Sequence, residues 1–268
     1  MDLNEDIASR IRGWIAAWPP RPDDKALYRV LRFIGLWRAI VLARTYVARE
    51  GAVVYQGLFK GMRYLERSSQ GTVLPRLLGV YEAELHPYFE EILRDGIDVI
   101  VDVGCAEGYY AVGLARHAPQ VTVHAHDIDA KARAACAELA QLNGVADRVV
   151  IGGEFKPADF QAYAGRRVLV LVDAEGAEVD ILDPALAPAL AGMSIVVETH
   201  DLFRPGAEAL IVARFSATHE ITRVVQRPKA YDMPAWMEGL TDLDLLLASW
   251  EARDQPTPWL VMRPRRPG

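Results

Sequence analysis

The sequence predicts a doubly wound α/β fold, in which a mostly parallel, seven-stranded sheet carries helices on both faces. Beyond residue 96, short apolar runs alternate with longer amphipathic segments, which is the order of strands and helices in such a sheet. These runs are apolar on both faces, as strands covered on both sides are. Before residue 96 the pattern is mostly helical. We therefore expect residues 1–95 to form a mainly helical N-terminal extension and residues 96–268 to form a Rossmann-like domain.

The elements of the α/β domain follow from the spacing of its apolar runs. The expected strands span residues 97–103, 121–127, 148–152, 168–173 and 194–199. The expected helices span residues 107–117, 130–143, 156–163, 178–190 and 206–216. Two later β-like runs, 219–226 and 258–262, lack a helical crossover between them and so predict an antiparallel edge.

An insertion at about residues 228–257 separates these last two runs. It contains four large apolar residues, Tyr231, Met233, Trp236 and Met237. Apolar and aromatic side chains near the rim of a sheet often shape a ligand pocket. We therefore expect the insertion to cover a substrate pocket.

The N-terminal extension begins with amphipathic helices at 4–17 and 24–50, the first ended by two prolines. A short hairpin is expected at 53–64, and a helical segment at 73–93 that restarts at Pro87. We expect the extension either to cover a substrate pocket or to pair with a second copy, giving a homodimer through the N-terminal helices.

Composition excludes several classes of protein. The 268 residues are 51% hydrophobic and 25% charged, the balance of an ordinary globular protein. A net charge of −6 makes nucleic acid an unlikely partner, because binding along a phosphate backbone needs a basic face. Cys105 and Cys136 are too few for a disulfide scaffold and suit a reducing compartment. The acidic start predicts no signal peptide, and arginines interrupt the apolar tract at 27–48, which predicts no transmembrane segment. A cytoplasmic protein is expected.

A glycine turn joins the first expected strand to the helix that follows it. Gly104 and Gly108 leave room for a ligand against the backbone, and the helix offers free N–H groups. The spacing is D-x-G-x-x-x-G, which differs from the G-x-G-x-x-G of dinucleotide enzymes. A glycine turn alone is weak support for a ligand site, since many strand–helix junctions need glycine.

The ends of the next two strands add to this signal. Asp127 comes about twenty residues beyond the glycines, where an acid accepts the ribose hydroxyls of a bound nucleoside. Asp127 or Asp129 could instead cap the helix that begins at residue 130; we expect Asp129 to cap and Asp127 to bind. After the third strand, Glu154 and Phe155 offer a hydrogen-bond acceptor and an aromatic wall suited to an adenine.

In these residues the chain resembles the class I S-adenosylmethionine-dependent methyltransferases, and more narrowly the FkbM-type methyltransferases. The resemblance rests on residues 102–110, similar to the family's DVGAN-x-GYY turn, and on residues 172–178, similar to its DVEGAE signature. It covers about residues 97–201. The chain departs from the family pattern with Cys105 and Ala106 in place of Ala-Asn, and with Ala174 in place of Val.

The resemblance implies S-adenosyl-L-methionine as cofactor and a methyltransferase domain over residues 96–268. It also implies that Asp102 and Gly104 lie near the amino-acid end of the cofactor, Asp127 at the ribose and Glu154 near the adenine. Tyr81, Glu82 and Glu84, just before the first strand, could close over the cofactor or instead form an exposed helical face. The candidate cofactor-binding residues are Asp102, Gly104, Cys105, Ala106, Gly108, Tyr109, Asp127, Ile128, Glu154 and Phe155.

The candidate catalytic residues, Asp173, Glu175 and His200, follow the fourth and fifth strands, at the edge where open α/β sheets bind ligands. His200 has the intrinsic pKa of a general base, and Glu198 or Asp201 could orient it. Alternatively, Asp173, Glu198 and His200 could ligate a divalent cation, although no ligand spacing is decisive. The sequence therefore leaves the metal question open.

The function expected from these residues is O-methylation of a hydroxyl on a small-molecule or sugar/glycan-like acceptor. An NAD(P)-dependent oxidoreductase is the alternative enzyme, but its glycine turn needs a third glycine where Ala106 and Glu107 stand. A cofactor-binding module without catalysis is a further alternative. The acids and the histidine at two strand ends weigh against it.

Overall fold

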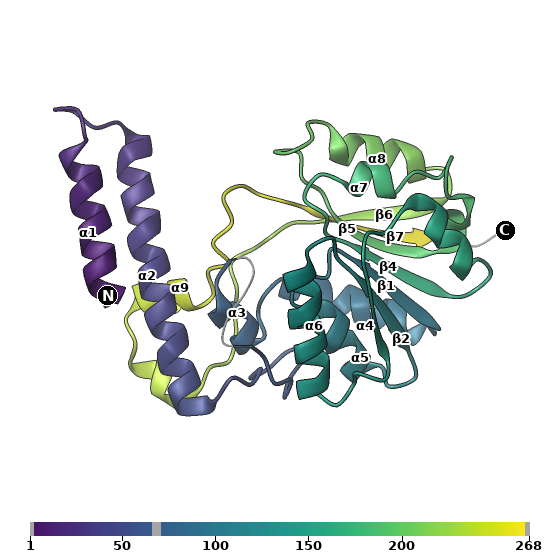
Figure 1. Ribbon diagram of the computed structural model, residues 1–268, viewed down its shortest axis with the longest axis horizontal. Coiled ribbons are helices and arrows are strands. Elements are labelled where there is room, and N and C mark those ends of the chain that lie inside the picture. Colours follow the sequence, from purple (N-terminus) through teal and green to yellow (C-terminus); the bar gives the residue numbers. More distant parts are fainter. Residues whose placement is uncertain (1–2, 66–70, 266–268) are drawn as a thin grey trace.

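A seven-stranded mixed sheet forms the centre of the computed structural model, which describes residues 3–65 and 71–265 (Figure 1). The strand order is β3-β2-β1-β4-β5-β7-β6. Strands β1 to β5 are parallel, whereas β7 runs antiparallel to both β5 and β6. The mostly parallel sheet and its antiparallel edge are thus confirmed. The strands are β1 Val99–Val103, β2 Thr122–His126, β3 Val149–Gly152, β4 Val168–Val172, β5 Ser194–Glu198, β6 His219–Val224 and β7 Trp259–Pro264.

Both faces of the sheet are buried under helices, as the uninterrupted apolar strands predict. In β4, Leu169 and Leu171 pack into one core, while Val168, Val170 and Val172 pack into the other. One face is covered by α4 His86–Arg94, α5 Tyr109–His117 and α6 Ala130–Leu142. The opposite face is covered by the 3₁₀ helices η2 Pro157–Tyr163 and η3 Pro188–Gly192, with α7 Glu178–Ile181 and α8 Ala207–Phe215.

Two expected helices are wrong in kind or length, and prolines account for one of them. The helix expected at 178–190 is the four-residue α7 followed by η3, because Pro184 and Pro188 interrupt any longer helix. The helix expected at 156–163 is the 3₁₀ helix η2, which begins at Pro157.

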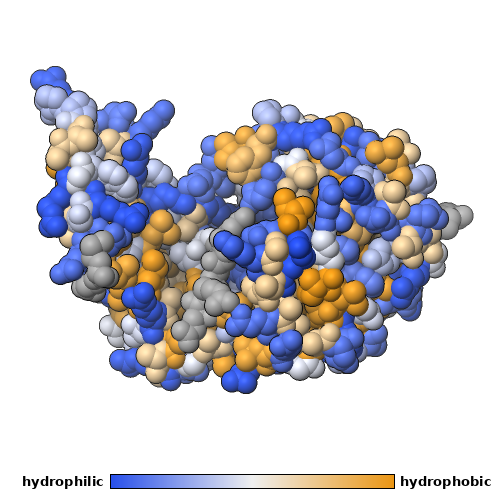
Figure 2. Space-filling view, viewed as in Figure 1, coloured by the Kyte–Doolittle hydropathy of each residue, from blue (hydrophilic) through white to orange (hydrophobic). Residues whose placement is uncertain are grey.

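The N-terminal helices stand beside the α/β domain. They are α1 Leu3–Ala16, which has no buried residue, and α2 Asp24–Glu50. The 3₁₀ helix η4 Ala235–Gly239 and α9 Asp242–Ala248 of the insertion join them, and Arg38 of α2 makes two hydrogen bonds to Asp244 of α9. Figure 2 shows the notch between the α1–α2 pair and the domain. None of the described helices is long and apolar enough to cross a bilayer.

The segment between α2 and the sheet packs into the main core. The hairpin expected at 53–64 is reduced to one antiparallel bridge between Val53 and Arg63. The expected helical segment at 73–93 divides into α3 Val73–Leu78, the 3₁₀ helix η1 Ala83–Leu85 and α4, with Pro87 in the first turn of α4 as predicted. This part of the extension lies against the edge of the sheet where the strands β1 to β5 end.

Candidate functional site

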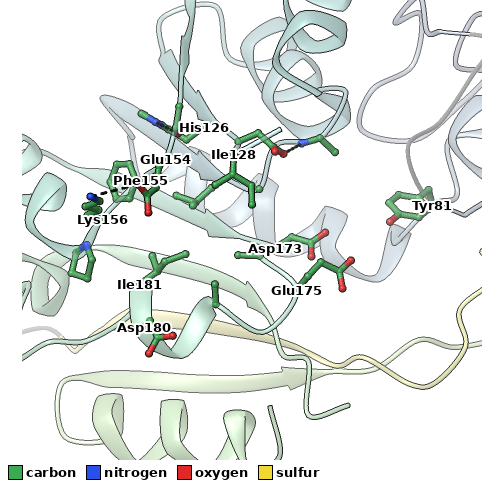
Figure 3. A pocket seen from close by; sticks show the side chains of 18 of the residues that line it. Tyr81, His126, Ile128, Glu154, Phe155, Lys156, Asp173, Glu175, Asp180 and Ile181 are labelled. Carbon is green, nitrogen blue, oxygen red and sulfur yellow. Dashed lines mark hydrogen bonds and ion pairs between the residues drawn. The ribbon is translucent and has the colours of Figure 1, made fainter. Parts of the chain in front are cut away.

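A cavity of about 570 Å³ opens at the carboxyl ends of β1, β2 and β4 (Figure 3). This is the edge at which open α/β sheets bind ligands. The volume lies within the range of small-molecule and cofactor pockets, about 300–1,000 Å³. The lining residues are Arg76, Tyr81, Val103, Gly104, Ala106, His126, Asp127, Ile128, Gly153, Glu154, Phe155, Lys156, Pro157, Asp173, Ala174, Glu175, Ala177, Asp180 and Ile181.

The glycine turn after β1 is shaped by close approach of its own backbone to β4. Gly104 has a φ of +86°, and a Cβ there would lie 1.7 Å from the carbonyl oxygen of Asp173. Gly108 serves packing instead, since its Cβ would lie 2.6 Å from the Sγ of Cys136 in α6. Between them Ala106 adopts a φ of 48°, which is unusual for a residue with a side chain. A hydrogen-bond partner from outside the turn would therefore stabilise this backbone conformation.

Asp127 supplies that partner from the end of β2. Its Oδ2 accepts a hydrogen bond from the Ala106 N–H at 3.0 Å, and its Oδ1 accepts one from the Asp129 N–H at 2.8 Å. Asp129 caps α6 by accepting from the Lys131 N–H at 2.9 Å, so the expected cap is confirmed. Asp127 thus joins the ends of β1 and β2 and faces the cavity.

Aromatic and charged side chains line the end of the cavity beyond Asp127. The rings of His126 and Phe155 lie edge to face, with centroids 4.8 Å apart. Lys156 Nζ lies 3.5 Å from a carboxylate oxygen of Glu154. Ile128 is 82% exposed and projects over the cavity (Figure 3). These groups form an apolar wall with polar ends, which suits a flat heterocycle.

Of the ten candidate cofactor-binding residues, six line the cavity: Gly104, Ala106, Asp127, Ile128, Glu154 and Phe155. The other four, Asp102, Cys105, Gly108 and Tyr109, do not line it. Burial, together with the charge of Asp127, raises the pKa of Asp102 to about 7. Tyr109 packs edge to face against Tyr81, with ring centroids 5.5 Å apart.

The candidate catalytic residues come together with two further acids. His200 Nε2 lies 3.6 Å from carboxylate oxygens of both Asp173 and Glu175, and 3.5 Å from Glu198. On its other side, His200 Nδ1 bonds the fully buried carboxylate of Glu178, the first residue of α7. One imidazole is therefore surrounded by four carboxylates.

These contacts set the protonation of the cluster. Burial alone would lower the pKa of His200, but hydrogen bonds to Glu178 and Glu198 and the charge of Asp173 outweigh it and raise the pKa to about 10. Burial and the charge of Glu198 raise the pKa of Asp173 well above its usual value. Burial opposes ionisation of Glu198 as well, but His200 and Arg253 lower its pKa to about 2. At neutral pH the imidazole therefore carries a proton, and Glu198 is ionised.

A second cavity of about 340 Å³ adjoins the first, and Tyr81 and Glu175 line both. His200, Glu198 and Arg253 line the second cavity and not the first. The nucleoside-sized cavity and this smaller one therefore meet at the acid–imidazole cluster.

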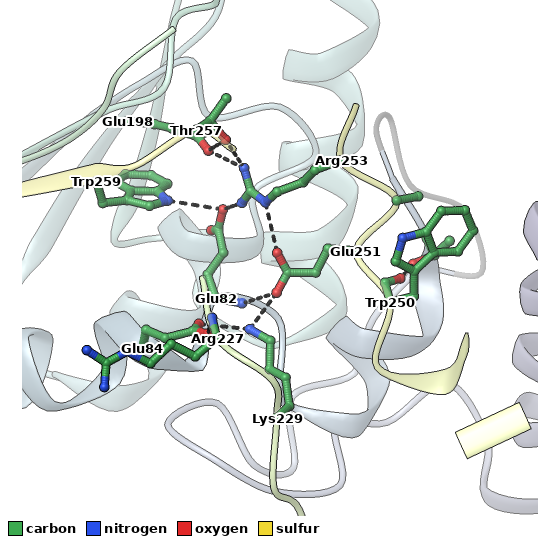
Figure 4. Close-up of polar contacts among 12 residues, drawn as sticks. Glu82, Glu84, Glu198, Arg227, Lys229, Trp250, Glu251, Arg253, Thr257 and Trp259 are labelled. Carbon is green, nitrogen blue, oxygen red and sulfur yellow. Dashed lines mark hydrogen bonds and ion pairs between the residues drawn. The ribbon is translucent and has the colours of Figure 1, made fainter. Parts of the chain in front are cut away.

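A buried ionic network lies beside the second cavity, which its members Glu198, Glu251 and Arg253 line (Figure 4). Arg253 bonds Glu82, Glu198 and Glu251, the last at 2.9 Å. Lys229 lies 2.6 Å from the other oxygen of Glu251. The network links the start of η1, β5 and the end of the insertion. Removing one member would leave an uncompensated buried charge, which is strongly destabilising.

Sequence reasoning missed Arg76 and Arg253, which have no motif around them, and His126, which directly precedes Asp127 at the end of β2. The expected lid is wrong at the residues named for it: Tyr231, Met233, Trp236 and Met237 line neither cavity. Instead, Tyr231 donates to the carbonyl of Leu245, and Trp236 donates to Glu50 of α2. Only the last part of the insertion, from residue 251, reaches the second cavity.

The cluster also offers ligands of the kind that hold a divalent cation. One ligand atom from each of Asp173, Glu175 and His200 lies within 4.8 Å of the other two. A metal-binding histidine usually donates its second ring N–H to a carboxylate, and Glu178 is so placed on His200. The geometry therefore suits either a proton on His200 or a divalent cation shared by Asp173, Glu175 and His200.

The chain matches no known protein-family profile and no curated protein. Similar solved structures include an O-methyltransferase from Bacillus cereus in complex with SAH, at 12% identity, covering 85% of this chain and 90% of that chain, with a TM-score of 0.45. Another is the C-terminal domain of precorrin-6Y C5,15-methyltransferase from Rhodobacter capsulatus, at 14% identity, covering 67% and 89%, with a TM-score of 0.43. At such identities and TM-scores, the functional argument rests on the residues of the two cavities.

Proposed function

We propose that the protein is an S-adenosylmethionine-dependent methyltransferase that methylates a hydroxyl group. The observation that carries this proposal is the pairing of cavities. A long cavity, with Asp127 at its centre and an aromatic wall at one end, suits an adenosine. It meets a smaller cavity at Asp173, Glu175 and His200, where a second substrate can reach a bound methyl donor.

The residues of the first cavity match the parts of the cofactor. Asp127 would accept hydrogen bonds from the ribose hydroxyls, and Phe155 with Ile128 would enclose the adenine. The cofactor supplies a methyl group already activated by its sulfonium, so the protein mainly aligns the acceptor and excludes water. With that cofactor bound, the acceptor oxygen would form its bond to the methyl carbon as the carbon–sulfur bond breaks, and the electron pair of that bond would stay on sulfur.

The hydroxyl proton needs an acceptor at the same moment. Because His200 already carries a proton at neutral pH, we propose Asp173 as the group that receives it. The raised pKa of Asp173 makes its ionised form a stronger base than an ordinary carboxylate, and it also means that this form is less populated at a given pH. His200 then holds Asp173 and Glu175 in place through its charge, and Glu175 would accept a hydrogen bond from the acceptor at the junction of the cavities.

The acceptor we propose is a small hydroxylated molecule or a sugar-like group. The second cavity presents carboxylates that accept hydrogen bonds from hydroxyls, and Phe203 offers it an apolar face. A place among the FkbM-type methyltransferases rests on residues 102–110 and 172–178 alone.

Two measurements test the proposal. Calorimetry with S-adenosylhomocysteine and with NADH should show binding of the first and not the second; binding of NADH alone would support the oxidoreductase instead. A panel of sugars and other alcohols, offered with S-adenosylmethionine, should release S-adenosylhomocysteine in an acceptor-dependent way. Transfer only to nitrogen, carbon or nucleic acid would overturn O-methylation while leaving methyl transfer standing.

A divalent cation is the alternative occupant of the cluster, favoured by the closeness of the ligand atoms of Asp173, Glu175 and His200. It would hold the acceptor oxygen and lower the pKa of its hydroxyl. Dialysis against EDTA separates the two possibilities. Activity that is lost and then restored by Mg²⁺ or Mn²⁺ favours the cation, and undiminished activity favours proton transfer to Asp173.

A further inference from the structure

A buried cation from the N-terminal extension lines the cofactor cavity. Arg76 belongs to α3, is 5% exposed, and lines the cavity beside Tyr81. The guanidinium lies 3.8 Å from the centroid of the Tyr81 ring, and its Nη1 donates to the carbonyl of Thr72 at 3.1 Å. Both contacts fix the plane and direction of the side chain.

The charges around the cavity are unevenly distributed. Among the described lining residues, Arg76 and Lys156 are the two lysine or arginine side chains, against five acids. Lys156 lies at the aromatic end, and Tyr81, with which Arg76 stacks, lies at the other end (Figure 3). A ligand that fills the cavity therefore meets a fixed positive charge at the end away from Phe155.

We infer that Arg76 binds the carboxylate of the methionine portion of S-adenosylmethionine, so that α3 and Tyr81 complete a cofactor site otherwise built by the α/β domain. The inference rests on the proposed function. With the adenine against Phe155 and the ribose at Asp127, the amino-acid end must extend toward Arg76 and Tyr81. A carboxylate is the part of the cofactor that needs a cation there.

Arginine suits this task better than lysine would. Its planar fork can bind both oxygens of a carboxylate at once, and stacking on Tyr81 holds that plane before the ligand arrives. Among the described residues, Glu107 has an oxygen 3.9 Å from the Arg76 Nε. A purely structural role, in which Arg76 only balances Glu107, is the competing explanation.

Two ligands that differ only in the carboxylate distinguish these roles. S-Adenosylmethionine and decarboxylated S-adenosylmethionine are titrated calorimetrically into the wild-type protein and into Arg76→Met. The wild type should bind the first about 10- to 100-fold more tightly, the value of a hydrogen-bonded charge pair. In Arg76→Met this ratio should fall close to one. Arg116→Met, which removes a positive charge outside the cavity, should keep the wild-type ratio.

Other outcomes are equally decisive. An unchanged ratio in a folded Arg76→Met protein overturns the inference and supports the structural role. If that variant does not fold, Arg76→Lys decides, because its single ammonium group lacks the fork and should lower the ratio several-fold. 5′-Methylthioadenosine, which lacks the amino-acid end, should bind wild type and variant alike and so report an intact cavity. A wild-type protein that binds none of these adenosine ligands would refute the proposed function, which is a different failure.

Discussion

Replacing Asp127 by asparagine tests the carboxylate that joins the ends of β1 and β2. In the wild type its two oxygens accept from the N–H groups of Ala106 and Asp129 at 3.0 and 2.8 Å. Asparagine keeps one acceptor and presents an NH₂ group to the other N–H. The lost bond to a charged acceptor is worth about 1.5–3 kcal/mol. Since Ala106 holds an unusual positive φ, the turn should relax once that bond is gone.

Stability and binding should therefore fall together. Urea unfolding, followed by tryptophan fluorescence, should show an unfolding free energy lowered by about 1.5–3 kcal/mol. Affinity for S-adenosylhomocysteine, measured by calorimetry, should fall by about 10- to 100-fold, because one ribose hydroxyl loses a charged acceptor.

Asp129→Asn is the matched control, since it removes the same charge two residues away. Asparagine caps helices about as well as aspartate, so α6 should keep its stability and the protein its affinity for S-adenosylhomocysteine. Equal affinity in wild type and Asp127→Asn would refute the role given to Asp127 at the ribose. Loss of binding in Asp129→Asn alone would reverse the two assignments.

Three more predictions follow from the geometry. Gly104→Ala should unfold the protein or lower its melting temperature sharply, because the new Cβ would lie 1.7 Å from the Asp173 carbonyl oxygen. Gly153→Ala is the control: its new Cβ would have nothing within 4 Å, so the melting temperature should change little in the same assay. The pKa of His200 is about 10 in the folded protein, against an ordinary 6.5. The stability that its proton contributes is therefore complete below pH 6.5 and is lost as the pH rises toward 10. Urea titrations across this range should show that the unfolding free energy falls more steeply with pH for wild type than for His200→Gln. Leu31 of α2 is 67% exposed. If the N-terminal helices form a homodimer, sedimentation should show a dimer in the wild type and a monomer in Leu31→Glu. A monomeric wild type would refute that homodimer.

The sequence was sufficient for the order of elements in the α/β domain. Strands such as β4, apolar at every position, are recognisable because burial on both faces leaves no polar position. Prolines marked the first turn of α4 correctly, whereas Pro184 and Pro188 should have ended the helix expected at 178–190.

For the candidate site, the sequence determined the residues whose place depends on a strand end. Gly104, Asp127 and Asp173 each follow a parallel strand, and parallel strands present their carboxyl ends at one edge of the sheet. These residues therefore lie close together in space regardless of how the other segments of the chain fold.

Tertiary structure alone decided which charged groups reach that edge from elsewhere. Arg76 comes from a short helix in the extension, and Arg253 from the end of an insertion; neither position has a periodicity or motif that ties it to a strand. The protonation of His200 was equally beyond the sequence. An isolated histidine has a pKa suited to a base. In the fold, hydrogen bonds to Glu178 and Glu198 and the charges of Asp173 and Glu198, brought together from two segments of chain, raise that pKa because they outweigh the cost of burying the cation.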